Sequence, residues 1–237
     1  PFHLQSFILK TSLLLLTLSF SWKTTAQITN LRFKSEAATY TPITGGTLIV
    51  QPGTALGAAS AVTDIGFTFN FQGVNYTQFS MNAAGILKLG SVAVTTESTN
   101  VTSSTTNTPK LFAWWDATYT GSSANGGGIR YLLEGSAPNR VMTVQFNGSY
   151  ALNSGGATTY QIKLYETSNK IEFIYGTGPT ATGQSASTGL GNFNSGREFI
   201  SVLTFNHIPS YGRAYDANAT WPGGDRKSTR LNSSHLV

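Results

Sequence analysis

The sequence has no cysteine and little charge, and each absence narrows the functions open to it. None of its 237 residues is cysteine, which excludes a disulfide framework, a thiolate-ligated metal and a thiol nucleophile. Only 11% of the residues are charged, whereas 12% are aromatic and 25 residues are glycine. Sustained helical periodicity is also absent. This composition is typical of an extracellular β-sandwich with many short strands.

Long apolar runs are confined to the N-terminal end of the chain. Lys10 precedes an apolar run at 12–20, and small residues follow at 24–26. A basic start, a short apolar core and a small-residue exit are typical of a secretory signal peptide rather than of a buried helix. The run is shorter than the ~20 residues that span a bilayer. We therefore predict a signal peptide over residues 1–26, with Gln27 as the first residue of a mature chain that has no membrane span.

The opposite end, residues 226–237, reads R-K-S-T-R-L-N-S-S-H-L-V and has no strand periodicity. It resembles translated adaptor sequence at the ends of unrelated assembled reads, so we predict a non-native tail that makes no stable contact with the domain. Of the 15 Lys and Arg residues, Lys10 and Lys23 lie in the predicted signal peptide and three lie in this tail. The remaining ten basic residues balance the 10 acidic residues within 27–225. A net charge of zero gives no reason to expect nucleic acid or an anionic membrane as a partner.

Alternating apolar residues predict a single β-sandwich domain over residues 27–225. Ile65, Phe67, Phe69 and Phe71 fall on one face of a strand, because side chains alternate between the two faces. A Gln-Gly turn then leads into a strand at 74–81. Further strands are predicted at 28–33, 47–50, 85–90, 111–116, 129–134, 139–146, 187–192 and 199–205, with a hairpin over 159–175. About a dozen such strands predict an all-β, antiparallel, jelly-roll-like sandwich, with exposed loops at 91–107 and 121–128.

The hairpin over 159–175 has the clearest alternation. Ile162 and Leu164 lie on one face, and the residues beside them, such as Lys163, lie on the other. A two- or four-residue connection through 168–169 pairs Leu164 with Phe173 and Ile162 with Tyr175. The hairpin is therefore expected to have one apolar face and one polar face.

Residues that carry out catalysis are scarce in the predicted mature domain. His207 is its one histidine, and no motif places a nucleophile and an orienting group beside it. Glu166 and Glu172 are close in sequence, and a glycosidase needs two carboxylates a few ångströms apart. Alternation nevertheless directs these two side chains to opposite faces, where we expect solvated charges. We predict that the chain is not an enzyme and that it needs no cofactor.

Trp114 and Trp115 are the candidates for ligand contact, because aromatic faces stack on sugar rings. Adjacent strand residues face opposite ways, so at most one of the two faces solvent. Trp114 shares its face with Asp116, whereas Trp115 shares its face with the apolar residues 111 and 113. Trp114 and Asp116 are therefore the candidate ligand-binding residues, whereas burial of both tryptophans in the core is the interpretation that we favour. Asp116 and Asp64 lack the spacing of a calcium loop, and no metal site is predicted.

Four sequence blocks occur in series and carry a family resemblance. They are Y-T-P-I-T-G-G-T from residue 40, I-G-F-T-F-N-F-Q-G-V-N-Y-T-Q-F-S-M-N-A-A-G from 65, G-S-A-P-N-R-V-M-T-V-Q-F from 135 and Y-Q-I-K-L-Y-E-T-S-N-K-I-E-F-I-Y-G from 160. Together they resemble the secreted β-sandwich modules near the N-termini of large surface proteins in gliding, type IX-secreting bacteria, which are similar to nidogen-like domains. The resemblance covers residues 40–190. It implies an extracellular, non-enzymatic module followed by further domains, and a last strand beyond Trp221 that this chain would lack.

Three functional hypotheses follow for a secreted or cell-surface protein whose partners are surface glycans or other extracellular proteins. The first is a non-catalytic structural or adhesion module, as a fragment of a larger multidomain protein. The second is a carbohydrate-binding module, which requires exposed aromatic residues in a concave sheet or a loop cleft. The third is a sandwich-fold glycosidase, which requires two carboxylates facing each other across a groove.

Overall fold

Alternating burial along the strands explains how this sequence forms its sheets. In the computed structural model, Ile65, Phe67, Phe69 and Phe71 of β3 (Thr63–Phe71) are buried, whereas Thr68 between them is exposed. The structure describes residues 31–53, 56–101, 104–121, 127–151, 158–178, 186–192, 198–203, 208–211 and 226–231. The predicted signal peptide and His207 lie outside these residues.

Two antiparallel sheets contain the fifteen strands found among the described residues. Sheet 1 has the order β1 (Arg32–Ala37), β15 (Arg226–Leu231), β11 (Ile171–Tyr175), β10 (Thr158–Tyr165), β9 (Val141–Ala151), β8 (Gly128–Glu134) and β2 (Thr47–Val50), and β7 (Thr118–Thr120) also pairs with β9. Sheet 2 has the order β14 (Ile208–Tyr211), β13 (Glu198–Leu203), β12 (Ser187–Asn192), β6 (Lys110–Trp115), β5 (Ile86–Leu89), β4 (Val74–Met81) and β3. The prediction of an all-β antiparallel sandwich is confirmed.

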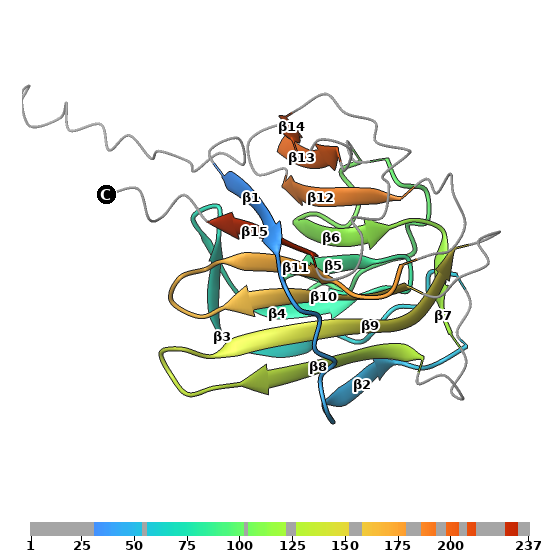
Figure 1. Ribbon diagram of the computed structural model, residues 1–237, viewed down its shortest axis with the longest axis horizontal. Helices are drawn as coiled ribbons and strands as arrows, with labels where there is room; N and C mark the ends of the chain where they lie inside the picture. Colours follow the sequence, from blue (N-terminus) through green and yellow to red (C-terminus); the bar gives the residue numbers. More distant parts are fainter. Residues whose placement is uncertain are drawn as a thin grey trace, which may run out of the picture.

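The main hydrophobic core lies between the two sheets (Figure 1). The phenylalanines of β3 meet apolar residues of β9, β10 and β11 there. Aromatic contacts add specific geometry to this core. The rings of Phe146 and Tyr160 stack with centroids 4.3 Å apart, and Phe79 meets Tyr131 edge to face at 5.7 Å.

The β10–β11 hairpin has the predicted faces but a different register. Leu164 pairs with Ile171 and Ile162 pairs with Phe173, two residues away from the predicted pairing. The Tyr165 N–H donates to the carbonyl of Lys170 at 3.1 Å, so the connecting loop is residues 166–169. A shift of two residues returns every side chain to the same face. The predicted apolar face is therefore confirmed, and the predicted pairing is wrong.

The outer face of sheet 1 is partly covered, so the polar face of the hairpin is not fully exposed to solvent. Residues 38–46, which we call the sheet 1 strap, cross this face between β1 and β2 (Figure 1). The Ile43 N–H donates to Gln145 Oε1 at 2.8 Å, and Gln161 Nε2 donates to the Thr41 carbonyl at 2.8 Å. Gln145 and Gln161 are joined to each other at 2.9 Å, and both are buried. Glutamine side chains on this face bind the strap instead of water.

The edge of β3 is capped by side chains from sheet 1. Arg140 donates from Nη1 to the Gly66 carbonyl at 2.6 Å, and the Asn70 N–H donates to Asn169 Oδ1 at 2.7 Å. Arg140 is held in place by two hydrogen bonds to the carboxylate of Glu166, from Nε at 2.8 Å and from Nη2 at 2.5 Å. The Gly66 carbonyl and the Asn70 N–H, which lie on the edge strand of sheet 2, therefore have side-chain partners.

The C-terminal segment 226–237 was expected to make no stable contact with the domain. The structure instead places Arg226–Leu231 as β15, paired with β1 on one side and β11 on the other. That expectation is wrong for these six residues. Ladder pairing uses backbone N–H and C=O groups, which a segment without side-chain alternation also carries. The position beside β11 is therefore filled, and the adaptor origin of the segment stays a prediction.

Candidate functional site

A β-bulge in β6 decides where the two candidate tryptophans point. Ser187 of β12 pairs with Trp115 and Gly189 pairs with Phe112, so that one residue of β12 opposes two residues of β6. The extra residue changes the alternation after Ala113. Trp114 consequently joins the core between the sheets, and Trp115 joins Phe112 on the outer face of sheet 2.

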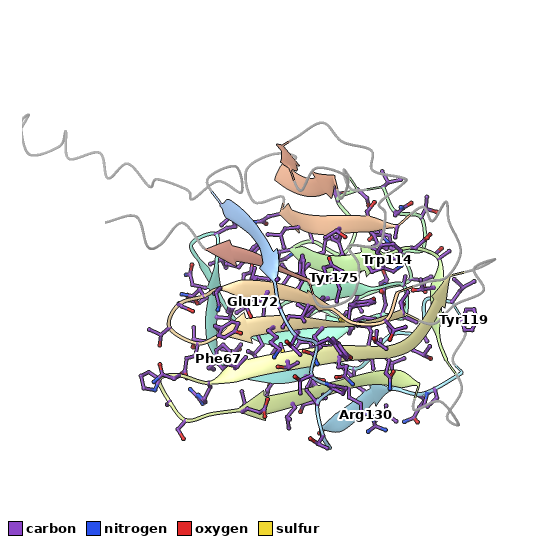
Figure 2. All side chains as sticks on the ribbon, viewed as in Figure 1. Phe67, Trp114, Tyr119, Arg130, Glu172 and Tyr175 are labelled. Atoms are coloured by element: carbon purple, nitrogen blue, oxygen red, sulfur yellow. The ribbon has the colours of Figure 1, made fainter. Side chains whose placement is uncertain are left out.

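Neither tryptophan is exposed, so Trp114 does not face solvent as a ligand-binding role would require. Both side chains are 0% exposed, and the favoured interpretation of two buried tryptophans is confirmed. Figure 2 shows Trp114 and Tyr175 within the body of the sandwich and Tyr119 at its rim. Asp116 is buried in the turn after β6, where its carboxylate accepts a hydrogen bond from the Ala117 N–H at 2.7 Å. Trp114 and Asp116 therefore do not form an exposed binding surface.

The carbonyl groups of the bulge are bound by hydroxyl groups. Tyr175 and Thr188 both donate to the Ala113 carbonyl, at 2.9 Å and 2.6 Å. Tyr160 donates to the Trp114 carbonyl at 3.2 Å. Burial raises the pKa of Tyr160 well above its ordinary value, which keeps the phenol protonated as a donor. Two tyrosines of sheet 1 thus fasten the irregular strand of sheet 2 across the core.

Most described residues of the loop at 91–107 are exposed or half-buried, as expected, but Val94 and Asn107 are buried against the outer face of sheet 2. Val94 is buried there in a small hydrophobic cluster with Phe112 and Trp115. The Val94 N–H donates to Ser80 Oγ at 2.7 Å, and the indole N–H of Trp115 donates to the Glu97 carbonyl at 2.9 Å. Short polar side chains of the sheet and of the loop therefore replace water as partners for the loop backbone.

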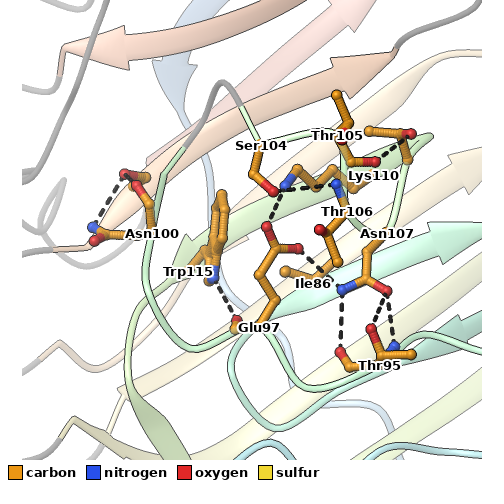
Figure 3. Close-up of polar contacts among 12 residues, drawn as sticks. Ile86, Thr95, Glu97, Asn100, Ser104, Thr105, Thr106, Asn107, Lys110 and Trp115 are labelled. Carbon is orange, nitrogen blue, oxygen red and sulfur yellow. Dashed lines mark hydrogen bonds and ion pairs between the residues drawn. The ribbon is translucent and has the colours of Figure 1, made fainter.

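A buried lysine lies beside Trp115, beneath the same loop (Figure 3). The side chain of Lys110 is 0% exposed, and its Nζ lies 3.0 Å from Glu97 Oε1 and 4.2 Å from the centre of the Trp115 ring. Burial lowers the pKa of Lys110, and the charge of Glu97 opposes that shift. A fully buried lysine is rare in proteins and is found where a partner or a chemical role retains it.

Asn107 binds the second oxygen of the same carboxylate. Its Nδ2 donates to Glu97 Oε2 at 3.0 Å and to the Thr95 carbonyl at 3.1 Å. Its Oδ1 accepts hydrogen bonds from the Thr95 N–H at 2.8 Å and from Thr95 Oγ1 at 3.1 Å. Lys110, Glu97 and Asn107 therefore form one connected group, which we call the outer cluster. Sequence reasoning missed it, and the available signal was a lysine directly before an apolar strand.

The two candidate carboxylates of the hairpin are engaged separately. Glu166 binds Arg140, and this hydrogen bonding lowers the pKa of Glu166. Glu172 lies in an ion pair with Lys170 at 2.7 Å and accepts a hydrogen bond from the Tyr165 hydroxyl. Glu172 is only 2% exposed, so the expectation of a solvated charge is wrong for this residue. The two glutamates therefore bind different partners.

Metal-ligating residues do not gather in the described part of the chain. Within it, no group of three or more His, Asp or Glu side chains could hold a metal ion. Asp64, on β3, accepts a hydrogen bond from Gln78 Nε2 at 3.0 Å. Asp216 and Asp225 lie outside the described residues.

Fold and side-chain packing define the class of this protein: an antiparallel β-sandwich module with both outer faces partly covered by its own loops. A family model described as NIDO related matches residues 30–224, and the chain belongs to this nidogen-related family. Domains of the family are typically extracellular. Comparison with curated proteins and with solved structures gave no match. Among the described residues, no helix is long and apolar enough to span a membrane.

Proposed function

We propose that the chain is a non-catalytic extracellular module with a structural or adhesion role, as part of a larger surface protein. The proposal is supported by one observation: the reactive and aromatic side chains of the candidate sites are buried or paired within the fold. Trp114 lies in the core, Trp115 and Lys110 lie beneath the 91–107 loop, and Glu172 is paired with Lys170. Membership of a typically extracellular family supports the same location. We further propose that a type IX system secretes this protein.

The two alternatives have less support from the side chains. A carbohydrate-binding module needs exposed aromatic rings, and Tyr119, at 36% exposed, is the most exposed aromatic residue among those whose burial the structure describes. A sandwich-fold glycosidase needs two carboxylates across a groove, whereas Glu166 and Glu172 bind different partners. These alternatives serve as outcomes of the test below.

Location is tested by inserting an epitope tag at Ser136, in the exposed turn between β8 and β9, within the parent protein. Antibody that cannot enter cells should label intact cells, and mild protease treatment of those cells should remove the label. Labelling only after lysis would refute the extracellular location.

Binding is tested with the purified chain on a glycan array and with a panel of glycoside substrates. We expect no retention and no hydrolysis. Retention that is lost in Tyr119→Ala, with an unchanged thermal midpoint, would replace the structural role with carbohydrate binding. Hydrolysis that is lost in Glu172→Gln would replace it with the glycosidase function.

A further inference from the structure

The outer cluster brings together three chemical groups that can react with one another. Lys110 supplies a primary amine, Asn107 a carboxamide, and Glu97 a carboxylate that contacts both. An ion pair needs only the first and the third. The asparagine is itself buried, at 6% exposed, and the Glu97 side chain is 10% exposed, so water has little access to the group.

We propose that Lys110 and Asn107 become joined by an isopeptide bond, with Glu97 as the proton carrier. Lys110 Nζ is the nucleophile, and Asn107 Cγ is the carbon that it attacks. No disulfide can form in this chain, because it has no cysteine. An amide bond between two side chains is a covalent link whose formation needs neither cysteine nor an oxidant.

The asparagine amide is oriented as an electrophile. Two donors of Thr95 bind Oδ1, its N–H at 2.8 Å and its Oγ1 at 3.1 Å. Donors that are fixed on a carbonyl oxygen stabilise the negative charge that develops there during attack. The leaving nitrogen, Nδ2, faces Glu97 Oε2 at 3.0 Å, where a proton can be delivered to it. Figure 3 shows the amine and the amide on the two oxygens of this one carboxylate.

The lysine is suited to the role of nucleophile. Only the neutral amine attacks, and burial lowers the pKa of Lys110. Glu97 Oε1, at 3.0 Å, is the acceptor for the proton that Lys110 loses. Asn107 and Lys110 are only three residues apart, so the chain itself keeps the two groups close.

The atoms and charges of the reaction balance without a co-reactant. One proton moves from the Lys110 ammonium to the Glu97 carboxylate, leaving a neutral amine. Its lone pair forms the bond to Asn107 Cγ, and the carbonyl electron pair moves to Oδ1. As the Cγ–Nδ2 bond breaks, Nδ2 takes the proton from Glu97 and one from the attacking nitrogen, and it leaves as ammonium. One ammonium and one amide give one secondary amide and one ammonium, and Glu97 is again a carboxylate.

Mass spectrometry of the folded wild-type chain tests the proposal directly. The intact mass should be lower than that of the sequence by one ammonia. Trypsin does not cleave after an acylated lysine, so digestion should give peptide 89–130 uncut at Lys110, and fragmentation should find Asn107 linked to Lys110. Cleavage at Lys110 together with the full mass would overturn the proposal. Loss of water with a link between Lys110 and Glu97 would also overturn it, because Asn107 would then not be the electrophile.

Variants separate this reaction from other sources of ammonia loss. Lys110→Arg, Asn107→Ala and Glu97→Gln should each have the full mass of their own sequence over residues 89–130. Lys88→Arg is the matched control, because Lys88 pairs with Lys110 on the neighbouring strand and should not affect the link. Ammonia loss within 89–130 that persists in Lys110→Arg would indicate cyclisation of an asparagine and would refute the link. The wild-type measurement decides the question even where a variant does not fold.

Discussion

Two hydroxyl groups donate to one carbonyl at the β6 bulge, and we predict that their contributions to the unfolding free energy are coupled. Tyr175 and Thr188 donate to the same Ala113 carbonyl, at 2.9 Å and 2.6 Å, and this carbonyl lies in the buried core. Tyr175→Phe removes one donor and leaves the ring, and Thr188→Val removes the other with little change of shape. Each single variant should lose about 1 kcal/mol of unfolding free energy, because the remaining hydroxyl still satisfies the carbonyl.

The double variant should lose more than the sum of the two. With both donors gone, the buried carbonyl bears its full desolvation penalty of about 1–3 kcal/mol, so we expect a coupling energy of about 1–2 kcal/mol. The measurement is urea unfolding of the four chains, with the slope of the transition checked for constancy. Tyr175→Phe combined with Ser80→Ala is the control, since Ser80 binds the Val94 N–H and shares no partner with Tyr175. Additivity within about 0.3 kcal/mol in the Tyr175–Thr188 cycle would refute the shared-acceptor reasoning.

Three further predictions concern the core, the bulge and the hairpin. Phe173→Ala should lower the unfolding free energy by about 3–5 kcal/mol, and Lys163→Ala should change it by less than about 0.5 kcal/mol; equal effects in urea titrations would contradict the assigned faces. Gly85→Ala should cost about 2 kcal/mol or more, because Gly85 has φ +99° and a Cβ would lie 2.1 Å from the Trp114 carbonyl oxygen; wild-type stability would disprove this constraint. Hydrogen bonding lowers the pKa of Glu166, so its stabilisation is complete above the ordinary carboxyl pKa of about 4.5 and is lost as the pH falls through the lower folded-state value. The thermal midpoint of Glu166→Gln should therefore depend less on acid pH than that of the wild type, and parallel curves would count against the pairing.

Strand positions could be predicted from the sequence wherever one face is apolar and the other polar. β2 and β4 have the predicted bounds. β3 begins at Thr63, two residues before the predicted alternation, and β11 ends at Tyr175, where the predicted hairpin ends. The short strand β7 has no alternation that could reveal it, and β14 was not predicted either. Hairpin register was wrong by two residues because a period of two cannot detect a shift of two. The positive φ of Asn169, at 49°, belongs to the turn that fixes the observed register.

Side-chain roles were harder to predict, for two physical reasons. The β6 residues are apolar on both faces, so alternation contains no information about the bulge that turned Trp114 inward. Polar residues on an outer face look solvated from sequence alone, yet Gln161 lies beneath the strap and Lys110 beneath the 91–107 loop. The strap is 120 residues away from Gln161 in the chain. The 91–107 loop directly precedes β6, but its polar sequence has no apolar pattern that would predict its packing against Lys110.

The capped edge of β3 affects how copies of this domain behave beside one another. An open edge strand is a template for pairing with another chain, and a dense layer of identical domains raises the rate of such encounters. At β3, an incoming strand would have to displace both the Arg140 side chain from the Gly66 carbonyl and the Asn169 side chain from the Asn70 N–H. The two side-chain caps therefore protect this edge against strand addition by a neighbouring copy.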